Sequence, residues 1–198
     1  MRTNIKNWFD FLSPIFIFII FQATLNFLLM RFSVGNSSAI VTIIMFPFAL
    51  FAYFLMRHGK KENANVTGKP FRWIDFLKCS LIVILFVVIT IVVSESTHVN
   101  KLTVLSILSM VLLGPTNEEI FYRGISFVKG ERLYGVATSM FITSLLFAVT
   151  HKGIKAIILA FALGCILCIV QKKHGRIEIV AIMHILINLF LTIYYYIF

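Results

Sequence analysis

The stretch Gly114-Pro115-Thr116-Asn117-Glu118-Glu119-Ile120-Phe121-Tyr122-Arg123-Gly124 places two adjacent carboxylates and an arginine inside an almost continuously apolar sequence. An ionised side chain in the hydrocarbon of a membrane costs from about 3 to more than 10 kcal/mol, so this cluster needs a reason. On a helix, Glu119 and Arg123 stand at i and i+4 with the acid on the N-terminal side, the favoured order for an ion pair. Glu118 lies about 100° round the same helix and has no basic residue at i+3 or i+4. The pattern predicts one paired and one free carboxylate, and a free, desolvated carboxylate can act as a general base.

The composition around this stretch is that of a helical membrane protein. Of the 198 residues, 60% are hydrophobic and only 13% are charged. Apolar runs of about 17 to 25 residues have the length of a membrane span. We therefore expect an all-α, polytopic membrane bundle of about seven transmembrane helices in one integral membrane domain. The predicted spans are Leu12–Met30, Ala39–Met56, Leu77–Val93, Leu102–Phe127, Tyr134–His151, Ile154–Val170 and Ile177–Tyr196.

Gly114-Pro115 predicts an interruption of the fourth span. Proline has no N–H to donate and its ring clashes with the preceding turn, so it breaks the hydrogen-bond ladder of a helix. Thr116 or Asn117 could then cap a new helix. The first turn of that helix would hold both glutamates, where the helix dipole favours negative charge.

The distribution of Lys and Arg predicts the orientation in the membrane. A net charge of +10 could indicate nucleic-acid binding in a soluble protein, but here the basic residues fall between the spans. If the N-terminus is cytoplasmic, the outer segments hold only Arg31, Lys101, Lys152 and Lys155, and the inner segments hold nearly all the others. The positive-inside rule therefore predicts a multi-pass protein with its N-terminus in the cytoplasm and its C-terminus outside. We expect it in a bacterial cell membrane. We expect the lipid bilayer as a partner and no nucleic acid.

Two further polar clusters lie in apolar spans. Phe147 and His151 close the fifth span, and His184 and Asn188 lie within the seventh, each pair at helical i, i+4 spacing. His151 beside Lys152 could be an ordinary interfacial residue, and His184 with Asn188 could form a structural bond between helices. Together with Glu118, however, these side chains suit hydrolysis of an amide by activated water.

In that hypothesis Glu118, helped by His151, takes the proton from water, and His184 and Asn188 stabilise the oxyanion. Glu119 and Arg123 would hold the helix. An alternative uses Glu118, His151 and His184 as ligands of a catalytic Zn²⁺ with water in the fourth position. Glu119 would then have to act as the base, which conflicts with its pairing to Arg123. We therefore prefer the scheme without a metal or other cofactor.

Three motifs follow one another along the chain: Glu118-Glu119-xxx-Arg123, Phe147-xxx-His151 and His184-xxx-Asn188. In this order they resemble the motifs of the CPBP intramembrane proteases. That family comprises the type II CAAX prenyl endopeptidases and the bacterial Abi proteins, which include bacteriocin self-immunity proteins. The resemblance covers roughly Leu102 to Asn188, so residues 1–100 would form N-terminal helices without motifs and residues 101–198 the catalytic core. It implies Glu118 as the water-activating residue, with His151, His184 and Asn188 completing the site and Phe147 in a supporting position.

The resemblance implies an endopeptidase that cleaves a membrane-associated peptide or protein, in peptide or bacteriocin processing or in self-immunity. A non-catalytic immunity or regulatory protein of the membrane is the alternative, and a proton-coupled carrier is a weaker one. One difficulty is geometric. On the predicted topology Glu118 lies about 15 Å from the inner end of its span, whereas His151 lies more than about 20 Å from the inner end of a full-length fifth span.

Overall fold

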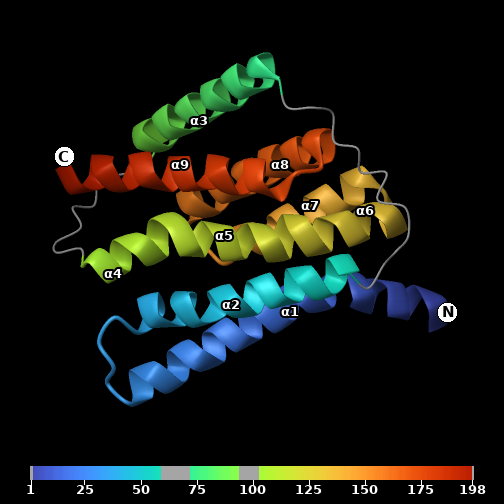
Figure 1. Ribbon diagram of the computed structural model, residues 1–198, viewed down its shortest axis with the longest axis horizontal. Helices are drawn as coiled ribbons and strands as arrows, with labels where there is room; N and C mark the ends of the chain where they lie inside the picture. Colours follow the sequence, from blue (N-terminus) through green and yellow to red (C-terminus); the bar gives the residue numbers. More distant parts are fainter. Residues whose placement is uncertain (1, 59–71, 94–102, 198) are drawn as a thin grey trace.

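The chain folds as a bundle of helices that run mainly along one direction (Figure 1). The computed structural model describes residues 2–58, 72–93 and 103–197, and every element in those ranges is helical. Six helices are long and apolar enough to cross a membrane, which confirms the helical membrane bundle. The elements are α1 (Arg2–Arg31), α2 (Ser37–His58), α3 (Trp73–Val93), α4 (Val104–Ile107), α5 (Gly114–Glu119), α6 (Val128–Tyr134), α7 (Val136–Ala148), α8 (Ile154–His174) and α9 (Ile177–Ile197). The polar segment Arg57–Trp73, between the second and third predicted spans, lies largely outside the described residues.

The fourth predicted span is one continuous helix, so the predicted interruption at Gly114-Pro115 is wrong. Val104–Tyr134 is helical throughout, with π-helical segments η1 (Leu108–Leu113) and η2 (Ile120–Phe127) on either side of α5. The backbone N–H of Gly114 donates to the carbonyl of Ser109, five residues back. This wider turn immediately precedes Pro115 and gives the ring room without ending the helix. Thr116 and Asn117 therefore cap nothing. Their side chains bond to the carbonyls of Leu112 and Thr42.

The fifth predicted span, Tyr134–His151, is also wrong as a full crossing. The helix there is α7, which has 13 residues and is therefore only about 20 Å long. The hydrocarbon core of a bilayer is about 30 Å thick, so α7 ends before it has crossed. The chain turns at Val149–Gly153 and returns as α8, which packs along α7. His151 belongs to this turn and not to the end of a transmembrane helix.

Two apolar cores hold the bundle together. One joins α1 and α2 to the long central helix and α7, with Ile15, Phe18 and Met45 packed on Phe121 and Phe147. The other joins α3 and α8 to α9. The central helix Val104–Tyr134 lies between the α1–α2 pair and α9, and the two ends of the chain lie at opposite ends of the bundle (Figure 1). Residues of this central helix can therefore face both sides.

Candidate active site

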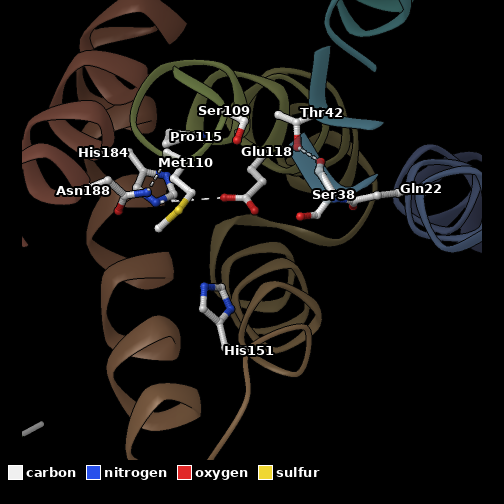
Figure 2. A pocket seen from close by; sticks show the side chains of 11 residues that line it. Gln22, Ser38, Thr42, Ser109, Met110, Pro115, Glu118, His151, His184 and Asn188 are labelled. Atoms are coloured by element: carbon white, nitrogen blue, oxygen red, sulfur yellow. Dashed lines mark hydrogen bonds and ion pairs between the residues drawn. The ribbon is translucent and has the colours of Figure 1, made fainter. Parts of the chain in front are cut away.

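A cavity of about 280 Å³ lies beside the middle of the central helix. Figure 2 shows Glu118 at its centre, with His184 and Asn188 on one side, Ser38 and Gln22 on the other, and His151 below. All four residues predicted to be catalytic line this one cavity, although they come from α5, the α7–α8 turn and α9. The full lining is Gln22, Ser38, Thr42, Ser109, Met110, Gly114, Pro115, Glu118, His151, His184 and Asn188.

The two adjacent glutamates face different surroundings. The Glu119 side chain is completely buried and accepts a hydrogen bond from Nη1 of Arg123 at 2.9 Å. The same carboxylate oxygen lies 2.8 Å from Nδ1 of His184, a contact that the sequence did not predict. The Glu118 side chain retains 28% exposure, and it faces the cavity. Their consecutive positions on one helix produce this division, because each residue advances about 100° round the axis.

Phe147 packs at the point where the motifs meet. Its ring is fully buried, and the guanidinium carbon of Arg123 lies 4.4 Å from the ring centroid. The ring centroids of His151 and His184 lie 4.8 and 5.7 Å from it, both in edge-on arrangements. One aromatic side chain thus contacts the cation that neutralises Glu119 and both imidazoles of the cavity. A cation over a desolvated ring contributes about 2 kcal/mol.

The contacts of His184 assign its protons. Glu119 offers only acceptor oxygens, so Nδ1 of His184 carries the hydrogen of that bond. Nε2 then points toward Glu118, with 4.0 Å between it and the nearer carboxylate oxygen. That separation is too long for a direct hydrogen bond. With a neutral ring, Nε2 carries a lone pair and accepts a hydrogen bond. With an imidazolium ring, Nε2 carries a proton and donates one. The proton at Nε2 therefore decides whether His184 binds a donor or an acceptor in the cavity.

The His151 ring, like that of His184, is held by a hydrogen bond at its Nδ1, here within its own turn. Its Nδ1 lies 3.0 Å from the carbonyl oxygen of Phe147, so Nδ1 is again the donor. The Thr150 hydroxyl donates to that carbonyl as well, at 2.7 Å. The Nε2 atom of His151 is therefore left for other partners. Because α7 is short, its C-terminal turn brings this ring to the level of Glu118, which removes the geometric difficulty of a full-length span.

Asn188 lies one turn beyond His184 on α9 and also reaches the cavity. Its amide nitrogen donates to the carbonyl of Met110 at 3.0 Å. That carbonyl belongs to η1, where the widened turn leaves Met110 on the cavity wall. The bond uses one N–H of Asn188 and leaves the second N–H and the amide oxygen for another partner.

Several lining residues lie outside the motifs, and sequence reasoning missed them. Gln22 comes from α1 and Ser38 and Thr42 from α2, within the residues 1–100 that carry no motif. Asn117 connects this wall to the central helix through its bond to the Thr42 carbonyl, 2.9 Å long. The one available signal was Gln22 itself, an amide in the middle of an apolar span.

The alternative of a metal site can be compared with these positions. Within the described ranges, no three His, Cys, Asp or Glu side chains lie close enough together to hold a metal ion. Glu118, His151 and His184 border one cavity but do not converge on one point. Glu119 is also occupied by Arg123 and His184, so it is not free to act as the base that the zinc scheme requires. In this arrangement the residues do not fit a zinc site.

Comparison with known proteins agrees with the motifs. The family model described as type II CAAX prenyl endopeptidase Rce1-like matches residues 100–190. The membrane-embedded CAAX protease MroQ of Staphylococcus aureus (strain USA300) is 26% identical over 134 residues, which cover 58% of this chain and 54% of that protein. The chain thus spans about half the length of this curated relative. No solved structure matches the chain. Both matches support the resemblance of the three motifs to the CPBP intramembrane proteases.

Proposed function

We propose that this protein is an intramembrane endopeptidase that hydrolyses a peptide bond with a water molecule activated by Glu118. The observation that carries the proposal is the division between the two glutamates. Glu119 is fully buried and bound by Arg123 and His184, whereas Glu118 faces a cavity that both histidines border. A carboxylate with access to water beside two imidazoles has the chemistry of a general base.

The proposed reaction follows from the positions of these groups. Glu118 takes a proton from water while the water oxygen attacks the carbonyl carbon of the substrate. The resulting oxyanion accepts hydrogen bonds from Nε2–H of His184 and from the second amide N–H of Asn188. The proton held by Glu118 then passes to the leaving nitrogen, the C–N bond breaks, and a carboxylic acid and an amine are released. His151 orients the water or relays the proton through its Nε2.

This scheme requires a proton on Nε2 of His184, and the charges of the cluster allow it. With Glu118 and Glu119 ionised and Arg123 and His184 protonated, the four groups carry two negative and two positive charges. A cluster of zero net charge avoids leaving an uncompensated ion in a low-dielectric environment.

The substrate class is part of the proposal. MroQ is named a membrane-embedded CAAX protease, which supports a peptide or protein substrate at the membrane. We infer a membrane-associated peptide or small protein, with a role in peptide or bacteriocin processing or in self-immunity. The bundle end nearer the N-terminus carries the basic residues Lys129, Arg132, Lys172 and Arg176. By the positive-inside rule, these residues support the orientation with a cytoplasmic N-terminus and an external C-terminus.

The test compares membrane peptides in cells that produce the wild type or Glu118→Gln. The amide keeps the shape of the side chain but removes the base, and positioned general bases contribute about 100- to 10,000-fold to rate. We expect an intact peptide to accumulate in the Glu118→Gln cells and the purified wild type to cleave it. Glu131→Gln, a substitution of a partly exposed glutamate at the bundle end, is the matched control. Equal cleavage by wild type and Glu118→Gln would refute the proposal.

A non-catalytic binding protein is the competing function. It would use the cavity to hold a peptide without cleaving it, for which the amide of Gln would serve as well as the carboxylate. In that case Glu118→Gln would retain the cellular phenotype, such as immunity, and no shortened peptide would depend on the wild type. The same pair of strains therefore distinguishes the two functions.

A further inference from the structure

The wall of the cavity opposite the histidines is also polar. Gln22 on α1 and Ser38 on α2 face Glu118 from that side, and the Gln22 side chain extends from its helix toward Ser38 (Figure 2). Thr42, beside them, is already engaged, because its hydroxyl donates to the Ser38 carbonyl and its own carbonyl accepts from Asn117. Ser109, a further hydroxyl of the lining, donates to the carbonyl of Ser106. The Thr42 and Ser109 hydroxyls are therefore already committed to the protein itself.

The Gln22 amide and the Ser38 hydroxyl differ from these neighbours. Neither side-chain group has a hydrogen-bond partner among the described residues. Gln22 belongs to a membrane span with a mean hydropathy of 2.0, where an amide without a partner costs free energy. Helix packing does not explain it, since an interhelical hydrogen bond would be the structural reason for such a residue and none is formed within the described part of the chain. Its orientation into the cavity indicates that the partner comes from outside the chain.

The chemistry of a glutamine matches one feature that every peptide substrate has. The side-chain amide presents an N–H donor and a C=O acceptor side by side, which complement the C=O and N–H of a main-chain peptide group. The Ser38 hydroxyl can donate or accept next to it. The histidine side of the cavity is committed to the reacting bond. The α1–α2 side is therefore available to hold the main chain next to the reacting bond.

We propose that Gln22, assisted by Ser38, forms a subsite that binds the main chain of the substrate peptide one or two peptide groups away from the scissile bond. This inference rests on the proposed function. It makes α1 and α2 part of the substrate site, although residues 1–100 carry no motif. Gln22 is a positioning residue in this scheme, because it contacts the substrate away from the reacting atoms.

The subsite lies toward one end of the bundle. Gln22 is about 13 Å from the end of α1 at Arg31, and Asn188 is about 13 Å from the end of α9, at 1.5 Å per residue. Ser38 is in the first turn of α2. These positions are all on the side of the α1–α2 turn and the C-terminus, so a peptide bound there would extend from the middle of the bundle toward that end (Figure 1).

The experiment measures KM and kcat separately in proteoliposomes. The probe is an internally quenched peptide that contains the sequence cleaved by the wild type and spared by Glu118→Gln. We expect Gln22→Met, which keeps length and removes the amide, to raise KM about 3- to 10-fold with little change in kcat, since one neutral hydrogen bond is lost. Ser38→Ala should raise KM by less. Thr24→Val, an exposed polar position on α1 outside the cavity, is the matched control.

Ester analogues of the probe identify the bond directly. Each replaces one non-scissile N–H by oxygen and so removes one main-chain donor. At one position the ester should raise KM for the wild type but not for Gln22→Met, because the variant already lacks the hydrogen bond between residue 22 and the substrate main chain. An unchanged KM in Gln22→Met, a loss confined to kcat, or equal effects of every ester in both proteins would overturn the subsite while cleavage itself stands. Absence of cleavage by the wild type would overturn the proposed function and the subsite with it.

Discussion

Replacing Arg123 by methionine tests how the site is held together. The guanidinium is completely buried, donates to Glu119 at 2.9 Å, and lies with its central carbon 4.4 Å from the ring centroid of Phe147. Methionine fills much of the same volume but carries no charge. Glu119 would then have only His184 as a partner in its buried position. The prediction concerns the free energy of unfolding of this variant and of its combination with Glu119→Gln.

The magnitude follows from the geometry. Two unit charges about 4 Å apart attract each other by about 4 kcal/mol at an effective dielectric constant of 20, and removing one partner of a buried pair costs about 3 to 5 kcal/mol. We expect each single variant, Arg123→Met and Glu119→Gln, to lose about that much, because each leaves the buried cluster with one uncompensated charge. The double variant leaves none. It should therefore be more stable than the sum of the single effects predicts, by about 2 to 3 kcal/mol.

The measurement is reversible unfolding in mixed micelles of dodecyl maltoside and sodium dodecyl sulfate, followed by far-ultraviolet circular dichroism. Arg132→Met, at an exposed position of α6, is the control and should change the free energy of unfolding by less than about 0.5 kcal/mol. Additive losses in the double variant would refute the reasoning. They would mean that Arg123 and Glu119 contribute independently and that the pair does not hold the central helix.

Two further predictions concern packing and metal dependence. A β-carbon at Gly130 would lie 2.6 Å from the Ser139 hydroxyl and would also clash with the Phe11 ring, so Gly130→Ala should lower the free energy of unfolding by about 1 to 3 kcal/mol. Gly35→Ala, with open space around the new β-carbon, is the control in the same unfolding assay. Cleavage should persist in 1,10-phenanthroline, and a loss of cleavage that added zinc restores would favour the metalloprotease alternative.

The predictions that succeeded from sequence depended on local spacing. The Glu119–Arg123 bond follows from i, i+4 placement on one helix, and the common face of His184 and Asn188 follows from the same periodicity. Hydrophobic runs identified the six long helices because each must cover its backbone with apolar side chains in lipid. These features need no knowledge of what lies elsewhere in the bundle.

The features that were predicted wrongly or missed depended on contacts between distant segments or on competing local structures. Gly114-Pro115 is a helix breaker in water, but a π-helical turn absorbs it here, and sequence pattern does not distinguish the two outcomes. The bond between His184 and Glu119 joins residues on different helices, so no periodicity indicates it. The same is true of Gln22 and Ser38, whose role in the cavity wall appears only once α1 and α2 pack on the central helix.

The short length of α7 determines whether the motifs can form one site. Glu118 lies about 21 Å from the start of a 31-residue helix and about 24 Å from its end, hence near its middle. A histidine at the end of a full crossing would be close to a membrane surface, and the usual tilt of about 20° would recover little of that separation. A helix of 13 residues ends roughly 10 Å short of the far boundary of a 30 Å core and turns there. The end of α7 and the turn that follows it thereby carry Phe147 and His151 to the depth of Glu118, where Phe147 contacts Arg123 and His151 borders the cavity. The fifth hydrophobic segment is therefore better understood as a re-entrant arm that delivers two motif residues than as a membrane span that ends in a histidine.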